Sequence, residues 1–250
     1  MSRYNDGMPK PTQKPTKHPH GALQVGHSKP LWRTRHRLRK ILHAPHVASK
    51  KRTGAPKAYK RLHVYKNVDE LAQAFFPDFD HKLSKIEALK RVRHMIRQLK
   101  YTVVEFDDDK PWGGMYRMAD DEAERFVAEF FPGLTMEEAK LGRHDVRLSP
   151  KFLLVEPGKR LSWQYHHRRA ERWHFLTEGA YEKSTHNSEP EPILAVVGTI
   201  VQFEHGERHR LCASKDTHYT LVAEIWQHTD ATRLSDEADI VRLADDYRRV

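Results

Sequence analysis

The feature that most constrains the fold is a series of short hydrophobic runs in the second half of the chain. These runs are rich in β-branched and aromatic residues and are separated by turn-forming residues. They span residues 152–155, 172–176, 193–197, 200–203 and 220–226. Several short strands broken by turns are typical of an antiparallel sandwich or barrel. We therefore expect a mainly β fold for this part of the chain.

Upstream of these runs the pattern changes to that of amphipathic helices. Between residues 67 and 100, apolar residues recur at steps of three or four, at Leu83, Ile86, Leu89, Val92, Ile96 and Leu99. Residues 101–106 then resemble a strand and residues 120–131 a second helix. Thr135 and Glu138 have the spacing of a capping box, which predicts a short third helix. We expect two or three helices that precede the β domain and pack on its outside.

Charge is distributed unevenly along the 250 residues. Residues 1–66 contain 17 Lys and Arg but only one acidic residue, Asp6, so this segment carries +16. The whole chain carries +10, which leaves −6 for residues 67–250. Seven of the 14 prolines also lie in the basic segment. Because such a segment buries too little apolar surface to order itself, residues 1–66 are expected to form a disordered basic arm.

Several interpretations of the basic arm stay open. It is a solvated tail, a segment that binds RNA or the ribosome through Trp32 and the arginines beside it, or a stretch upstream of the true start codon. Its Arg-rich composition also resembles a transit peptide, although serine is scarce. No apolar run is long enough to predict a membrane span, and no signal-peptide core follows Met1. The single cysteine, Cys212, excludes a Cys-rich zinc site. A cytoplasmic location is expected.

Candidate metal ligands lie between residues 157 and 209. Gln164 and His166 are two residues apart, so on a strand their side chains point to the same face. A turn would return Glu171 to that face, and His209 closes a second cluster of polar residues. An amide oxygen, two imidazoles and a carboxylate would suit one divalent cation. Since no thiolate is available, this set of ligands suits Zn, Mn, Fe, Co or Ni and does not choose among them; Zn is the first expectation.

The spacing of these residues resembles the two sequence motifs of the cupin family. The first motif, Gly-x5-His-x-His-x4-Glu, carries Gln164 in place of its first histidine. The second, Gly-x5-Pro-x-Gly-x2-His-x3-Asn, carries Glu204 in place of proline and Ala213 in place of asparagine. Residues 161–173 are similar to the Leu-Ser-Leu-Gln-x-His-His-His-Arg-x-Glu-x-Trp signature of type II mannose-6-phosphate isomerases.

Three further segments resemble that family in the same order, so the resemblance covers roughly residues 101–249. Residues 110–113 are similar to its Arg-Pro-Trp-Gly motif, Lys151 to the lysine before a strand, and residues 239–249 to its closing motif. The chain departs from the pattern at Arg168, which replaces a histidine, and at the closing motif, where Ala238 replaces an acid and Arg248 a glycine. No segment has room for the nucleotidyltransferase domain that often precedes this cupin, which excludes guanylyltransferase activity.

The resemblance implies a metal-dependent aldose–ketose isomerase that converts mannose 6-phosphate to fructose 6-phosphate or acts on a related hexose or heptose phosphate. The implied metal ligands are Gln164, His166, Glu171 and His209. We expect the catalytic residues to be Lys151, Glu207 and Arg242, and the substrate-binding residues to be Arg169 and Trp112. Lys151, Arg169 and Arg242 are the cations able to hold the phosphate. The general base is left open among Glu207, His205 and Lys151.

The expected architecture is a cupin double-stranded β-helix, or jelly roll. It comprises the basic arm of residues 1–66, a helical segment of residues 67–100 and a cupin domain of residues 101–250. The resemblance also implies a homodimer. The alternative function is a non-catalytic cupin that binds a sugar or nucleotide-sugar and docks on RNA through its basic arm.

Overall fold

The computed structural model describes residues 65, 67–214 and 218–249. These residues belong to one compact unit, Ala58–Val250. Apart from Tyr65, the basic arm predicted for residues 1–66 lies outside the described residues, and so does its predicted role in nucleic-acid binding.

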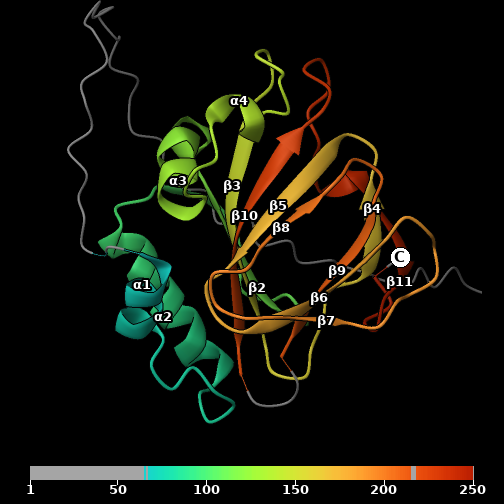
Figure 1. Cartoon of the computed structure of the whole chain (residues 1–250). Helices are drawn as coiled ribbons and strands as arrows, with labels where there is room; N and C mark the ends of the chain where they lie inside the picture. Colours follow the sequence, from blue (N-terminus) through green and yellow to red (C-terminus); the bar gives the residue numbers. More distant parts are fainter. Residues whose placement is uncertain (1–64, 66, 215–217, 250) are drawn as a thin grey trace, which may run out of the picture. The chain divides into compact units, whose positions relative to one another are not determined.

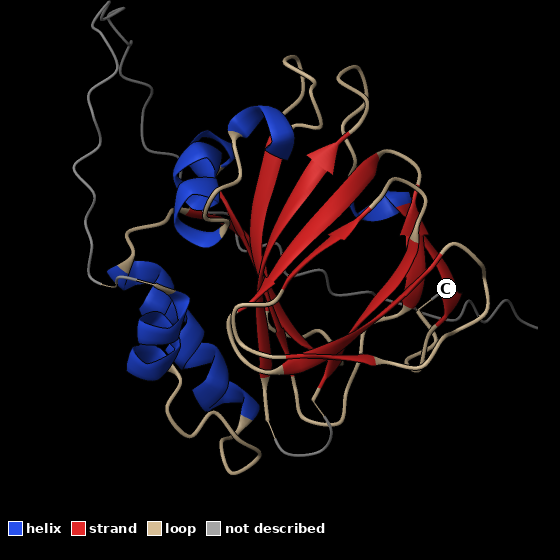
Figure 2. Ribbon diagram, in the orientation of Figure 1, coloured by secondary structure: helices blue, strands red, loops and turns tan. Residues whose placement is uncertain are grey.

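Two antiparallel sheets form the body of this unit (Figures 1 and 2). The first sheet contains, in spatial order, β1 (Val103–Asp107), β2 (Gly113–Met118), β3 (Leu148–Val155), β10 (Thr220–His228), β5 (Arg169–Phe175) and β8 (Ile200–Phe203). The second sheet contains, in spatial order, β11 (Ile240–Ala244), β4 (Trp163–His166), β9 (Arg208–Ala213), β6 (Gly179–Ser184) and β7 (Ile193–Ala195).

The strand order is that of a jelly roll. The eight strands from β3 to β10 lie as β3-β10-β5-β8 in one sheet and as β4-β9-β6-β7 in the other. The chain therefore crosses between the sheets at most connections, as in the double-sheet jelly roll on which cupins are built. Strands β1, β2 and β11 extend the two sheets at one side. This topology confirms the predicted fold class.

The helices cover the face of the first sheet that points away from the second (Figure 1). They are α1 (Val68–Phe75), α2 (Lys85–Gln98), α3 (Ala123–Phe130) and α4 (Met136–Ala139). Two short 3-10 helices, η1 (Asp120–Glu122) and η3 (Glu237–Asp239), are separate elements. The predicted capping box is present at the start of α4, where the Thr135 hydroxyl accepts from the Glu138 backbone and the Glu138 carboxylate accepts from the Thr135 backbone.

Helix α2 buries most of the apolar stripe predicted for it, with one exception. Leu89, Val92 and Ile96 are buried, whereas Ile86 is 63% exposed. Six residues at about 100° each place Ile86 about 120° away from Val92 around the helix axis, so it lies outside the packed face. Met95 takes part in the buried face instead.

The two faces of the first sheet bury two different cores. One core lies between the helices and the outer face, and it includes Phe126, Phe152 and Leu221. The second core lies between the two sheets, and it includes Trp173, Phe203 and Leu211. Because side chains alternate along a strand, β3 and β10 supply residues to both cores. The second core forms the apolar side of the candidate site.

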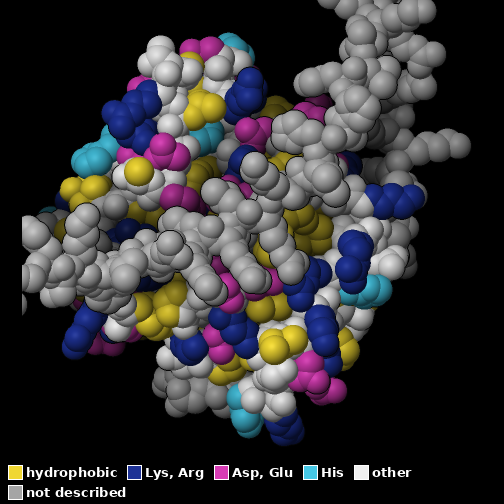
Figure 3. All heavy atoms as spheres, turned by 180° about the vertical axis from the view of Figure 1, so that it is seen from behind, with side chains coloured by type: hydrophobic (Ala, Val, Ile, Leu, Met, Phe, Trp, Pro, Cys, Tyr) yellow, Lys and Arg dark blue, Asp and Glu magenta, His cyan; other side chains and the backbone are white. Residues whose placement is uncertain are grey.

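The surface of the described unit mixes both signs of charge. In the view from behind, Lys and Arg side chains lie among Asp and Glu side chains, with apolar side chains between them (Figure 3). Four exposed apolar side chains lie on or beside the end strands β7 and β8, at Ile193, Leu194, Val196 and Ile200. The expected homodimer stays a prediction. Among the described helices, none combines the length and apolar character that a membrane crossing requires.

Candidate metal centre

Three predicted metal ligands meet between the two sheets. His166 is the last residue of β4 and His209 lies on β9, both in the second sheet, whereas Glu171 lies on β5 in the first. Between β4 and β5, the two-residue turn at 167–168 carries the chain from one sheet to the other. Glu171 therefore faces the histidines across the interior, and not along one sheet face as the sequence suggested.

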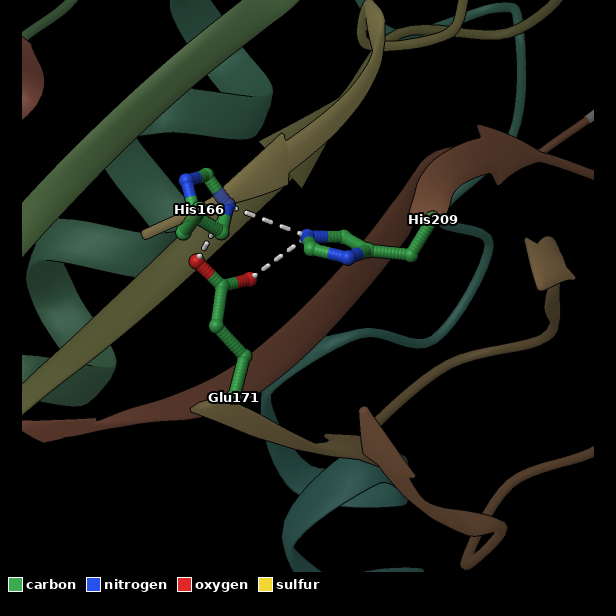
Figure 4. Close-up of side chains that lie close together, drawn as sticks. All are labelled: His166, Glu171 and His209. Carbon is green, nitrogen blue, oxygen red and sulfur yellow. Dashed lines mark hydrogen bonds and ion pairs between the residues drawn. The ribbon is translucent and has the colours of Figure 1, made fainter. Parts of the chain in front are cut away.

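The three side chains point at a common position (Figure 4). The Nε2 atoms of His166 and His209 are 3.2 Å apart. One carboxylate oxygen of Glu171 lies 3.1 Å from His166 Nε2, and the other lies 3.2 Å from His209 Nε2. All three residues are at least 98% buried. Nitrogen and oxygen donors on a tetrahedral zinc with bonds of 2.0–2.1 Å would be about 3.3 Å apart, so the spacing suits one metal ion.

The partners of the other ring nitrogens fix the tautomer of each histidine. Nδ1 of His209 lies 2.9 Å from the backbone oxygen of Glu207, and Nδ1 of His166 lies 3.4 Å from that of Asp239. A carbonyl oxygen only accepts, so in the neutral rings Nδ1 carries the hydrogen and Nε2 offers its lone pair. Two lone pairs and a carboxylate thus face one point, an arrangement that a cation stabilises.

Burial and charge together keep the ligands ready for a metal. Burial, followed by the nearby charge of Arg169, lowers the pKa of His166 to about 4. Burial pushes the pKa of Glu171 upward, but the positive charge of Arg169, 2.7 Å from the carboxylate, outweighs it and holds that pKa well below its usual range. At neutral pH, His166 is therefore neutral and Glu171 is ionised, which are the forms that bind a metal.

Arg169 supports the ligands from the side. Its Nε donates to Glu171 at 2.7 Å, and its Nη2 lies 3.2 Å from His166 Nε2. Its Nη1 donates to the hydroxyl of Ser235 at 2.7 Å, and its guanidinium stacks 3.5 Å over the Trp226 ring. Arg169 was expected to bind the substrate. Glu171 and Ser235 accept from its Nε and Nη1, contacts that suit a role in positioning the ligands, and its part in substrate binding stays a prediction.

Asp239 ties the turn at 167–168 to the C-terminal part of the chain. Its carboxylate accepts from the backbone nitrogens of His167 at 3.2 Å and Arg168 at 3.0 Å, and from the Ser235 hydroxyl at 2.6 Å. The Arg168 side chain donates to Asp236 at 3.1 Å and lies 3.8 Å from the carboxylate of Asp239. The replacement of the family's third histidine by Arg168 therefore leaves the three meeting ligands in place.

Gln164, the fourth predicted ligand, lies on the same sheet face as His209. The two residues are directly opposite each other on β4 and β9. Gln164 lines the same cavity as Glu171, and its Oε1 accepts from the Ser162 hydroxyl at 2.6 Å. Its place in the metal shell remains a proposal.

A small cavity of about 50 Å³, partly open to solvent, adjoins the metal ligands. It brings together most of the predicted site residues, namely Trp112, Lys151, Gln164, Arg169, Glu171 and Arg242. Lys151 is 98% buried, forms an ion pair with Glu237 at 3.1 Å, and lies 3.0 Å over the Trp226 ring. Burial lowers the pKa of Lys151.

Two acidic residues of the cavity, Glu224 and Glu237, were not predicted from the sequence, and two predicted residues, Glu207 and His205, lie outside the cavity lining. Glu224 on β10 is directly opposite Lys151 and accepts from Trp173 Nε1 at 2.9 Å, and Glu237 holds Lys151. Burial, followed by repulsion from Glu171, raises the pKa of Glu224 well above its usual range. Glu207 instead caps the β8–β9 turn, where it accepts from the Glu204 backbone and forms an ion pair with Lys183.

The other alternative base, His205, is also outside the cavity lining. Its Nε2 contacts the backbone oxygen of His167, and its side chain lies on the exposed turn before β9. Of the three bases left open by the sequence, Lys151 is therefore the one that lines the cavity.

Comparison with known proteins finds matches in structure alone, since no protein-family model and no curated protein sequence matches the chain. The matching structures include a DMSP lyase, DddQ from Ruegeria pomeroyi DSS-3, at 16% identity over 41% of this chain and 45% of that one, with a TM-score of 0.30. A cupin 2 conserved barrel domain protein from Salinispora arenicola CNS-205 matches at 14% identity over 49% of this chain and 81% of that one, with a TM-score of 0.32.

A third match is a mutant of the oxalate decarboxylase OxdC from Bacillus subtilis, at 14% identity over 59% of this chain and a TM-score of 0.36. This chain spans less than half of the DMSP lyase and 31% of the decarboxylase. The jelly-roll assignment rests on the strand order of the chain itself. The fold and the site thus define a jelly-roll protein with a buried His-Glu-His group suited to a divalent metal.

Proposed function

We propose that this protein is a metal-dependent cupin enzyme that isomerises a sugar phosphate, with mannose 6-phosphate as the first substrate to test. One observation carries the proposal: the lone pairs of His166 and His209 and the carboxylate of Glu171 converge beside a cavity lined by cations and acids. The similarity of residues 161–173 to the type II mannose-6-phosphate isomerase signature supports the choice of substrate.

An aldose–ketose isomerase moves a proton between C1 and C2 of an open-chain sugar. A divalent ion bound by His166, Glu171 and His209, with Gln164 as a fourth donor, would polarise the carbonyl oxygen. The chain itself must supply a group that accepts the proton and returns it. Lys151 and Glu224 face each other on β3 and β10 at the cavity, and their pKa values are shifted toward neutrality. We assign the transfer to this pair, at Nζ of Lys151 or the carboxylate of Glu224.

Trp173 and Phe203 hold the ligands in position. The ring of His209 packs 5.5 Å from Trp173 and 4.8 Å from Phe203, measured between ring centroids. The indole nitrogen of Trp173 fixes Glu224 at the same time. The buried side chain of Trp173 thus orients both His209, a metal ligand, and Glu224, one of the two residues proposed to transfer the proton.

Turnover of mannose 6-phosphate tests the proposal. We expect full-length protein loaded with zinc or manganese to form fructose 6-phosphate at about 1–100 turnovers per second. His166→Ala should lose about 1,000-fold or more, because both the metal and the orientation of the substrate are lost. His205→Ala, which changes the same residue type outside the cavity, should retain activity.

A coupled assay for fructose 6-phosphate gives the rates. The proposal fails if protein with bound metal turns over neither mannose 6-phosphate nor any other hexose or heptose phosphate. In that case the non-catalytic sugar-binding cupin becomes the better account.

A further inference from the structure

The charges along the cavity are almost all paired with one another. Its lining contains five cationic side chains, at Lys110, Lys151, Arg169, Arg242 and Arg249. Lys110 forms an ion pair with Asp107 at 3.3 Å, and Lys151 forms one with Glu237 at 3.1 Å. Arg169 is held by Glu171 at 2.7 Å, and Arg249 by Asp245, with Nε at 3.0 Å from the carboxylate. Four of these five lining cations are therefore neutralised by acids of the chain.

Arg242 is the exception. Among the described residues, the side chain of Arg242 has no hydrogen-bonding or ion-pair partner, and its Nε is buried. Burial, followed by the charge of Arg249, lowers the pKa of Arg242. The side chain as a whole is only partly buried, and the carboxylates of Asp245 and Glu237 are near enough to attract it. A guanidinium N–H that is removed from water without an acceptor nevertheless costs free energy.

A second unpartnered donor lines the same cavity. Trp112 is 96% buried, and its indole Nε1 has no hydrogen-bond partner in the described part of the chain. An indole nitrogen only donates, so the atom that satisfies it must be an acceptor. Gly113, the next residue, has φ of 152° and lies so close to Leu154 that a side chain there would strike its carbonyl oxygen. This close backbone approach fixes the position of Trp112.

The register of the second sheet relates Arg242 to the metal ligands. Arg242 on β11 lies opposite Gln164 on β4, and Gln164 lies opposite His209 on β9. Residues in one such row point to the same face, and neighbouring strands are about 4.8 Å apart. Arg242 thus lies two strands, or about 10 Å, from His209 on the same interior face. An irregularity in the β4–β11 register between residues 242 and 244 adjoins this position, and such irregularities often re-aim a side chain next to a site.

We propose that Arg242 and Trp112 form the oxyanion subsite of the cavity and that its ligand is a phosphoryl group. The guanidinium supplies charge and a planar set of donors that match phosphate oxygens, and the indole adds a further N–H. The identification of the ligand as the phosphate of a sugar phosphate rests on the proposed function. The subsite itself does not, because it follows from two buried donors without partners. A substrate would extend from this subsite toward the His-Glu-His group.

Binding of inorganic phosphate to the full-length protein, measured by calorimetric titration, tests the subsite. Arg242→Gln removes the charge and should weaken phosphate binding about tenfold or more. Trp112→Phe keeps an aromatic ring but removes the N–H, and should weaken binding about fivefold. Arg93→Gln makes the same charge change on α2, where Arg93 is paired with Asp108, and should leave binding within twofold.

Two further titrations test whether the bound metal or the basic subsite holds the phosphate, and whether the subsite prefers a phosphoryl group to a carboxylate. His209→Ala should bind phosphate as the unchanged protein does, since the subsite does not include the metal. Acetate should bind more weakly than phosphate if the subsite fits a phosphoryl group.

The proposal is overturned if the unchanged protein binds no phosphate, if Arg242→Gln binds it equally well, if binding disappears in His209→Ala, or if acetate binds as tightly. Should Arg242→Gln not fold, as judged by circular dichroism, Trp112→Phe decides. An inactive protein that still binds phosphate through Arg242 would refute the isomerase but leave the subsite standing.

Discussion

Replacing Glu171 with glutamine should destabilise the folded protein by about 3–5 kcal/mol in the presence of a chelator. Glu171 is buried and is the closer of two carboxylates that pair with the buried Arg169: it lies 2.7 Å from Nε, whereas Asp239 lies 3.9 Å from Nη1. The amide keeps the shape of the side chain but not its charge. Removing the closer partner of a buried ion pair leaves the arginine with only the more distant Asp239 in a medium that solvates the charge poorly, which is why the loss is large.

The measurement is urea denaturation of both proteins with chelator, so that bound metal does not contribute. Glu105→Gln is the matched control. Glu105 forms an ion pair with Arg117 at 3.1 Å, but its side chain is 48% exposed, so this substitution should change the free energy of unfolding by about 1 kcal/mol or less. If Glu171→Gln lowers the free energy of unfolding no more than Glu105→Gln does, the buried ion pair between Glu171 and Arg169 does not stabilise the fold as described.

Replacing His209 with alanine should weaken zinc binding about 100-fold or more. His209 supplies one of three converging donor atoms, and its Nδ1 is tied to the Glu207 backbone, so the ring is held ready for a metal. Loss of a partner that merely orients a ligand typically weakens metal binding 10- to 100-fold, and loss of the ligand itself should exceed that range. Competition with a coloured zinc chelator measures the affinity.

His205→Ala is the control for this experiment. His205 lies on the turn that precedes β9, is exposed and contacts a backbone oxygen, so zinc affinity should change less than twofold. Equal zinc affinity in His209→Ala and the unchanged protein would show that the converging side chains do not bind metal.

Much of the fold was predictable because its signals are local. The run at residues 200–203 and the capping box at Thr135 each depend on neighbouring residues, and both are present as β8 and at the start of α4. Strand β9 was missed because it contains Arg208, His209 and Arg210, which break the apolar pattern. His209 and Arg210 are buried because the candidate metal site and ion pairs receive them, and no local pattern predicts such partners.

The candidate site was predictable where it depends on spacing within one motif. His166 and Glu171 belong to one motif and meet across a two-residue turn, and His209 meets them from a second motif. Glu224 was not found, because it lies in an apolar strand with no motif around it and becomes part of the cavity only through strand pairing with Lys151. The pairing of Arg169 with Glu171, and the lack of any partner for Arg242, are also properties of the packed structure.

The most direct test of the central claim is the amount of divalent metal that the full-length protein retains. Elemental analysis after dialysis against excess zinc and gel filtration should find one equivalent per chain, and the His166→Ala/His209→Ala double variant should retain less than a tenth of that. If the unchanged protein retains no more metal than the double variant, the His-Glu-His group is not a metal centre.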